Sequence, residues 1–316
     1  MSDSLPLVSI VTPSYNQGAL IEETIHSVLS QDYPRIEYIV VDGGSTDGTL
    51  GILRKYEDHL TWFSGPDEGQ SDAINKGFQK SHGAILAWLN SDDIYLPGAV
   101  RTAADYLAAH PEVAMVYGDC NMVDGQGQVV GWSIWVEDFD LRRLVEDLDY
   151  IYQPATFFRR QAFEGVGGLD IELHYCMDYD LWIRIGKKYP VRHIPHVLAN
   201  VRVYPHTKTA SGGEERWQEV FEVGRRHGGG IFAPRYHHAK RAYYYTRSGL
   251  GCLSKGKVKE AMGRFSKALE SWPAINLSVL VAAVAKILRY RRLSSAARGS
   301  VSEGPPHLDE DWSIHS

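Results

Sequence analysis

The chain lacks the features that define several common classes of protein. Its 316 residues include only three cysteines, Cys120, Cys176 and Cys252. They are too few and too widely spaced for a disulfide framework or a paired-cysteine metal site. Such scarcity is typical of a reducing compartment, so we expect a cytoplasmic protein. A surplus of basic residues is also missing, because the formal net charge is −6, which argues against nucleic acid as a partner.

Long apolar runs are missing as well. The amino terminus has neither the basic segment nor the apolar core of a signal peptide. No stretch reaches the roughly 18 uninterrupted apolar residues that a membrane span needs. The nearest, residues 275–292, is interrupted by Asn276, Ser278 and Lys286. It is either an amphipathic helix at the inner face of an anionic membrane or, as we slightly favour, a helix packed on its own C-terminal region.

What is present is an alternation of strands and helices. Apolar runs predict strands at residues 7–13, 36–42, 60–64 and 84–89. Helical spacing follows each of them after a short turn, which predicts an α/β fold with parallel pairing. Asp42, Asp67 and Asp92 then all lie just beyond strand ends, on the edge of the sheet where α/β proteins bind ligands.

The fourth of these strands ends on adjacent acidic residues, in the stretch "AILAWLNSDDIY". Two neighbouring carboxylates, Asp92 and Asp93, repel each other and cost stability unless something compensates. A divalent cation compensates them well, because Mg²⁺ typically uses one or two protein carboxylates together with substrate phosphates. The pair is therefore either tolerated in open solvent or neutralised by a divalent cation, and the rest of the chain has to decide between the two readings.

The rest of the chain is less regular. We expect a hairpin with an Asp-Gly turn near residues 121–131, a helix from about Asp178 to Lys188, two short strands within residues 191–205, and a linker at residues 225–235. Beyond the linker, one tetratricopeptide-like helical hairpin is indicated by large, small and turn residues at Tyr245, Gly249, Ala261, Phe265, Ala268 and Pro273.

Five linked motifs carry a family resemblance. They are "VSIVTPSYN", "VVDGGSTDGT", "PDEGQSDAINKGF", "WLNSDD" and "MDYDLWIRI". In order and spacing the chain resembles family-2 glycosyltransferases of the GT-A fold, of the bacterial polysaccharide-biosynthesis type, over roughly residues 5–210. We therefore expect a GT-A domain over residues 1–235, with a nucleotide-binding half at 5–120 and an acceptor half at 121–210. A helical tail over 236–292 and a disordered end over 293–316 complete the expected organisation.

The resemblance assigns the loop after the first strand to a nucleobase. Pro13, Tyr15 and Asn16 lie there, and a rigid loop with an aromatic ring offers a stacking face to a flat heterocycle. The alternative is that Tyr15 only covers the edge of the sheet.

Three more residues belong to the expected nucleotide site. The resemblance implies that Asp42 accepts the imide N–H of uracil, whereas Ser45 and its neighbours are also typical of a helix start that Asp42 would cap. Asp67 matches the position that completes the base pocket. Lys76 either meets a phosphate as a point charge or is a solvated surface lysine.

At the acidic strand end, the family commonly carries Asp-x-Asp where this chain has Asn90, Ser91 and Asp92. The resemblance implies that Asp92 binds Mn²⁺ or Mg²⁺. Asn90 and Ser91 can hydrogen-bond the ribose, and Asp93 is expected to support the loop.

The acceptor side is expected at "MDYDLW". Transfer with inversion needs a base that deprotonates the attacking hydroxyl. The resemblance assigns this role to Asp178, with Asp180 as the runner-up, and Met177 replaces the usual glutamate. His206 and Lys208 are further candidates for contact with the diphosphate.

The resulting hypothesis is an inverting, metal-dependent glycosyltransferase. It would move a sugar from a nucleoside diphosphate, UDP by preference, to a polysaccharide or lipid-linked glycan. A nucleotidyltransferase is the rival enzyme, but the first-strand loop has no basic residue. A nucleotide-sugar-binding or scaffold protein is the non-enzyme rival, supported by Asn90 and Met177. The C-terminal helices are the expected site of any membrane or protein contact.

Overall fold

The computed structural model describes residues 5–133, 136–146, 149–204, 207–229, 245 and 257–271. The chain divides into two compact units, with the boundary between His227 and Gly228. In the second unit, the structure describes Tyr245 and helix α11 (Val258–Ser271). Gly249, Pro273, His206 and residues 275–316 lie outside the described residues. The tetratricopeptide-like hairpin, the amphipathic helix and the disordered end therefore stay predictions.

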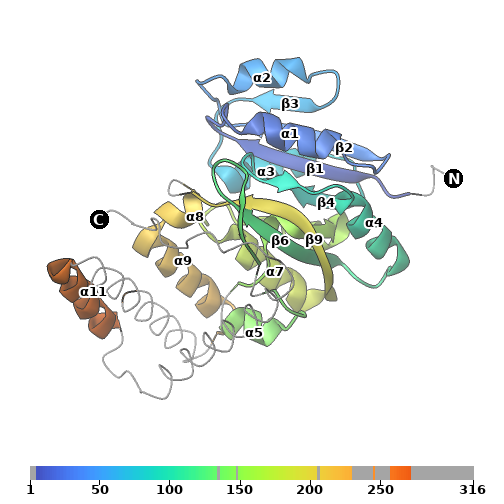
Figure 1. Cartoon of the computed structure of the whole chain (residues 1–316). Helices are drawn as coiled ribbons and strands as arrows, with labels where there is room; N and C mark the ends of the chain where they lie inside the picture. Colours follow the sequence, from blue (N-terminus) through green and yellow to red (C-terminus); the bar gives the residue numbers. More distant parts are fainter. Residues whose placement is uncertain are drawn as a thin grey trace, which may run out of the picture. The chain divides into compact units, whose positions relative to one another are not determined.

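A nine-stranded sheet forms the centre of the first unit (Figure 1). Its order is β3-β2-β1-β4-β8-β6-β9-β5, and β7 pairs with β6. The strands are β1 (Val8–Ser14), β2 (Ile36–Asp42), β3 (Thr61–Ser64), β4 (Ile85–Trp88), β5 (Ile94–Tyr95), β6 (Met115–Val123), β7 (Val129–Trp132), β8 (Thr156–Arg159) and β9 (Val191–Arg202). The first four pair in parallel, and β8 runs antiparallel to β4 and β6. The predicted α/β fold is confirmed.

Helices cover both faces of the sheet. Strand β4 shows how, because Ile85 and Ala87 join one apolar cluster and Leu86 and Trp88 join the other, as alternating side chains must. The first cluster includes residues of α1 (Ile21–Leu29), α2 (Thr49–Lys55) and α4 (Ala99–Ala109). The second includes residues of α3 (Gln70–Lys80), α5 (Leu141–Glu146), α6 (Arg160–Gly165) and α7 (Met177–Lys188). Burial on both faces explains why these strands are continuously apolar.

Four strand ends meet at one edge of the sheet. The register pairs Ser14 with Asp42 and Asp42 with Ser64, and β4 ends beside β1 at Trp88. The loops that follow these strands therefore lie side by side. They contain Asn16, Gly43, Asp67 and Asp92, which the sequence places just beyond the strands.

The sequence predicted that the first strand ends at Pro13. The structure differs, because β1 continues to Ser14. The Ser14 carbonyl accepts the N–H of Gly43 on the β2 side. The backbone N–H and C=O groups of successive residues in a strand point toward opposite neighbouring strands. The nitrogen of Pro13 therefore points toward β4. There the ladder already stops at the pair Val11–Trp88, so the missing N–H costs nothing.

Two later segments also differ from the prediction in detail. The described residues 191–204 contain one strand, β9, instead of the two short ones predicted. Tyr117 pairs with His193 and Asp119 with Val197, so β9 advances by four residues where β6 advances by two. Pro195 lies in this bulge, where the ladder needs no donor from it.

The β6–β7 hairpin is confirmed, but the left-handed residue of its turn is Gly127, with φ of 80°, and not Gly125. The Asp124 carboxylate accepts the N–H groups of Gln126 and Gln128, which makes the turn longer than the predicted Asp-Gly pair.

Candidate active site at the strand ends

The loop after β1 is anchored to the turn after β2. The Asn16 N–H donates to Ser45 Oγ at 2.7 Å, and Asn16 Oδ1 accepts from the Thr46 N–H at 2.9 Å. Asn16 has a φ of 53°, a left-handed conformation that asparagine tolerates. The anchored loop leaves the ring of Tyr15 62% exposed, and an exposed ring at this edge is available for stacking.

Asp42 holds the turn that follows β2. Its side chain is only 1% exposed. Oδ2 accepts from the N–H groups of Gly44 at 3.0 Å and Ser45 at 2.9 Å and from the Ser64 hydroxyl at 2.7 Å. Oδ1 accepts from the Ser45 hydroxyl at 2.5 Å. These bonds give Asp42 the structural role that was the alternative reading. They leave one acceptor position on Oδ1, so the role in base binding stays a prediction.

Asp67 packs against the same turn. A Cβ added at Gly43 would lie 2.7 Å from Asp67 Oδ2, so a larger residue there would force the Asp67 carboxylate to move. Asp67 Oδ1 accepts the Gly69 N–H at 2.9 Å, which orders its own loop. The structure thus brings Asp67 beside the turn that Asp42 holds.

Lys76 is engaged at the surface. Its Nζ lies 2.6 Å from Asp72 Oδ2, one helical turn away, and its side chain is 45% exposed. The hydrogen bond with Asp72 raises the pKa of Lys76. This arrangement matches the reading of a solvated lysine, and contact with a phosphate would require Lys76 to leave Asp72.

Asp93 holds in place the loop of residues 90–93, which we call the acidic loop. It is 4% exposed. Its carboxylate accepts the backbone N–H of Arg202 at 3.0 Å and the Asn90 amide at 3.2 Å. Burial and the charge of Asp92 raise the pKa of Asp93 well above its usual range. Its position and bonds are those of a loop support, as the sequence suggested.

Asp92 is the more accessible of the two acids. Its Oδ2 accepts from the Tyr204 hydroxyl at 3.0 Å, and its carbonyl accepts from Arg202 Nε at 3.1 Å. Burial raises the pKa of Asp92. Tyr204 approaches from the segment that follows β9, so the carboxylate is held by a residue 112 positions away in the chain.

No group of three or more His, Cys, Asp or Glu side chains that could hold a metal occurs among the described residues. The donor set at the strand end nevertheless fits Mn²⁺ or Mg²⁺, because such ions often use one or two carboxylates and complete their coordination with water and substrate phosphates. Asp92, with Asn90 and Ser91 before it, is the part of the chain that would meet such an ion.

Asn90 belongs to a chain of polar side chains. Gln70 Nε2 donates to Asn90 Oδ1 at 2.7 Å, and Lys208 Nζ donates to Gln70 Oε1 at 2.9 Å. Lys208 lies in α8 (Lys208–Ser211), and burial lowers its pKa although the charge of Asp178 opposes this. Ser91 is 6% exposed beside Asn90. These two hydrogen bonds link Asn90, at the acidic strand end, to Lys208, which interacts with the charge of Asp178. Nothing in the sequence singled out Gln70.

Asp178 lies in the first turn of α7, with a second carboxylate nearby. Burial raises the pKa of Asp178, against the Tyr179 N–H and the positive charges of Arg216 and Lys208, which lower it. Burial and the charge of Asp178 raise the pKa of Asp149 well above its usual range. Both carboxylates therefore hold a proton to a higher pH than an ordinary aspartate does. No motif in the sequence marks Asp149.

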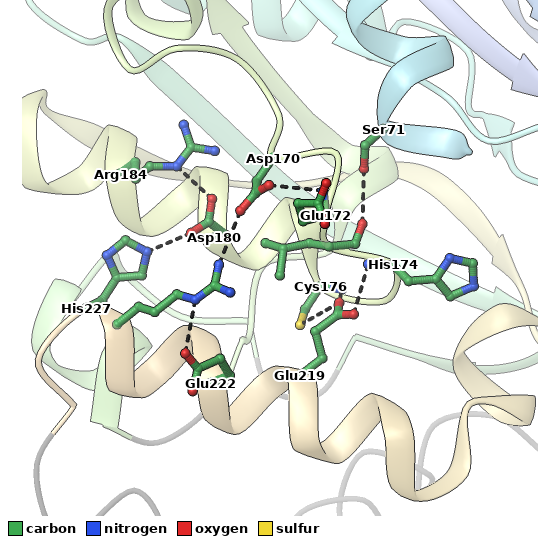
Figure 2. Close-up of polar contacts among 12 residues, drawn as sticks. Ser71, Asp170, Glu172, His174, Cys176, Asp180, Arg184, Glu219, Glu222 and His227 are labelled. Atoms are coloured by element: carbon green, nitrogen blue, oxygen red, sulfur yellow. Dashed lines mark hydrogen bonds and ion pairs between the residues drawn. The ribbon is translucent and has the colours of Figure 1, made fainter. Parts of the chain in front are cut away.

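Asp180 has a different environment. It is 5% exposed. Arg184 Nε lies 2.6 Å from its Oδ2, and His227 Nε2 lies 2.7 Å from its Oδ1 (Figure 2). Burial alone would raise the pKa of Asp180, but the bonds from His227 and Arg184 outweigh it and lower the pKa. Both oxygens are occupied by structural partners, which favours Asp178 over Asp180 as the base.

The family is now established by comparison. The model of Glycosyl transferase family 2 matches residues 9–167, half of the chain, so the chain belongs to this family. Asp178 and the segment around Tyr204 lie beyond the matched residues. Among the described residues, no helix is long and apolar enough to cross a membrane.

Relatives of known sequence or structure agree with this assignment. Chondroitin synthase of Escherichia coli is 28% identical over 203 residues, which are 62% of this chain and 29% of that enzyme. S. aureus TarS in complex with UDP-GlcNAc superposes with a TM-score of 0.57 at 19% identity, covering 83% of this chain and 81% of the other. The mannosyltransferase PcManGT of Pyrobaculum calidifontis, in complex with GDP-Man and Mn²⁺, gives 0.57 at 21%, covering 93% and 84%. The fold is that of GT-A glycosyltransferases.

Proposed function

We propose that the protein is an inverting, metal-dependent glycosyltransferase that moves a sugar from UDP to a polysaccharide or lipid-linked glycan. One observation carries the proposal. The bonds from Lys208 to Gln70 and from Gln70 to Asn90 connect the acidic strand end with the segment that faces Asp178. A donor site and a buried carboxylate that ionises near it are the two parts that such a transfer needs.

The chemistry follows from these positions. When the donor is bound, Mn²⁺ or Mg²⁺ supplies positive charge to the departing diphosphate. Asp178 accepts the proton of the acceptor hydroxyl while the hydroxyl oxygen bonds to C1 of the sugar. The bond from C1 to the diphosphate breaks, and UDP leaves with the electron pair. Asp92 would hold the ion, and Tyr15, Asp42 and Asp67 would hold the nucleoside.

The relatives support parts of this proposal. TarS is seen with a UDP-sugar, PcManGT with a GDP-sugar and Mn²⁺, and chondroitin synthase is named for a polysaccharide product. UDP is preferred here because the acceptor position left on Asp42 Oδ1 suits the imide N–H of uracil.

A thermal-shift screen of nucleoside diphosphates with Mn²⁺ tests the donor. Binding to the folded state raises the melting temperature by mass action, so UDP should raise it most. A larger shift with GDP would replace uracil by guanine in the proposal. Hydrolysis of UDP-sugars then separates enzyme from scaffold, because a binding module releases no UDP above background.

We expect Asp42→Ala to weaken UDP binding and to lower the melting temperature together. The substitution removes every bond that the carboxylate makes to Gly44, Ser45 and Ser64, and each buried bond contributes about 1 kcal/mol. Turnover with saturating donor should not change. The measurement is calorimetric UDP affinity, taken well below the melting temperature. An unchanged affinity there would leave Asp42 with the structural role alone.

A further inference from the structure

We infer that Glu219 is a positioning residue for Asp178, an inference that rests on the proposed function. Asp178 is the second residue of α7, and Cys176, at the N-cap, provides no side-chain cap. The turn that leads into the helix is held instead by α9 (Gly213–Arg226), which carries Glu219. This helix lies outside the residues that the family model matches, so no family motif points to it.

One carboxylate binds three successive backbone N–H groups. Glu219 Oε2 accepts from His174 at 2.9 Å, and Oε1 accepts from Cys176 at 2.7 Å (Figure 2). Oε1 also accepts from the N–H of Tyr175 at 2.5 Å. The Cys176 thiol also donates to Oε1, at 3.2 Å. Burial alone would raise the pKa of Glu219, but these backbone bonds outweigh it and lower the pKa. The carboxylate is therefore charged, and bonds to a charged acceptor are the stronger kind.

Two further contacts join the same segments. A Cβ added at Gly212, just before α9, would lie 2.6 Å from Tyr175 Cε1, so the turn packs closely on the start of α9. At the C-terminal end of α9, His227 contacts Asp180, which lies in the first turn of α7. Contacts from both ends of α9 therefore hold the segment that runs from Tyr175 to Asp180.

The consequence for Asp178 is geometric. With an amide in place of the Glu219 carboxylate, only one oxygen is left for three adjacent N–H groups, and the N–H₂ group in the other position cannot accept. A buried N–H that loses its acceptor must find another partner. The turn would reorient, and Asp178 follows Cys176 by two residues. A displacement of about 1 Å from the productive geometry can reduce a rate by about 10²-fold. The donor site, formed by the loops after β1 to β4, would not change.

The test compares Glu219→Gln with Glu222→Gln in the full-length protein. Glu222 lies on the same helix but pairs with Arg225 and Arg226 at the surface, so it controls for the loss of one charge from α9. With saturating UDP-sugar and Mn²⁺, we expect the turnover of Glu219→Gln to fall by about 10- to 10²-fold. The donor KM and the dissociation constant of UDP should stay at the wild-type value, and Glu222→Gln should match wild type throughout.

Amide hydrogen exchange provides the second readout. The N–H groups of residues 174–176 should exchange faster in Glu219→Gln and at the normal rate in Glu222→Gln. Normal turnover in Glu219→Gln, or a loss of UDP affinity as large as the loss of turnover, overturns the inference. If Glu219→Gln does not fold, Glu219→Asp replaces it, because it keeps the charge and shortens the reach. The same measurements then apply, and the same outcomes support or overturn the inference.

The proposed function can fail separately. If the wild-type protein transfers no sugar, the exchange experiment still decides the positioning contact: unchanged exchange at residues 174–176 in Glu219→Gln overturns it, and faster exchange supports it.

Discussion

Asp178→Asn is expected to abolish nearly all sugar transfer while UDP affinity and melting temperature stay almost unchanged. Asparagine keeps the size and the hydrogen bond of Asp178 Oδ1 to the Tyr179 N–H, but it cannot accept a proton. General bases typically contribute about 10²- to 10⁴-fold in rate. Because a base acts only in the transition state, turnover should fall and donor binding should not. Single-turnover kinetics and UDP calorimetry measure the two effects separately.

Two matched variants make this result specific. Asp149→Asn removes only the neighbouring carboxyl group and leaves Asp178 in place, so it should retain transfer if Asp178 is the base. The Asp180→Asn variant should have a lower melting temperature than the wild type, because Arg184 and His227 lose a charged partner. If Asp180→Asn abolishes transfer and Asp178→Asn does not, the base is Asp180.

The turnover of the wild-type protein should rise with pH as Asp178 loses its proton. Because burial raises the pKa of Asp178, this rise should occur at a higher pH than it would for an ordinary carboxylate.

Asp92→Asn is expected to remove most transfer as well, but through the metal. The substitution takes away the charge that would meet Mn²⁺ and keeps an oxygen for the Tyr204 hydroxyl. Burial raises the pKa of Asp92, so a neutral side chain there should not lower stability. A metal contributes several kcal/mol to a transition state, or roughly 10²-fold or more in rate. UDP affinity measured with Mn²⁺ and with chelator should show the loss only when Mn²⁺ is present.

Asp93→Asn is the control for this variant. The Asp93 carboxylate is 4% exposed and bonds the Arg202 N–H and the Asn90 amide, so its replacement should affect transfer less than Asp92→Asn. Wild-type activity of Asp92→Asn in saturating Mn²⁺ would remove Asp92 from the mechanism.

The placement of the strand-end acids at one edge of the sheet was predictable because its determinants are local. Each acid follows an apolar run, and parallel strands place their ends at one edge whatever the side chains are. Asp42 shows the limit of this reasoning, since its bond to the Ser64 hydroxyl depends on the register of β2 with β3. The sequence indicates that Asp42 is at the edge and can cap the turn after β2, but not that β3 also supplies a donor to its carboxylate.

The surroundings of Asp178 were less predictable because their contacts join segments far apart in the chain. Glu219 contacts Cys176 across 43 residues, from a polar helix that carries no motif. Asp149 stands in an ordinary acidic stretch, and only folding brings it near Asp178. The strand β9 was mispredicted for a related reason. A bulge around Pro195 continues a ladder that a turn would end, and local composition does not distinguish the two.

The side chain of Arg202 makes the acidic loop rigid. Its guanidinium bonds the carbonyls of Asp92 and Gly125 and the carboxylate of Glu23, and its side chain is 2% exposed. A loop that is already ordered loses little conformational entropy when a nucleotide binds. Selectivity among donors should then come from the shape and charge of a preformed surface, and slow rearrangement of residues 90–93 should not limit the rate of donor association.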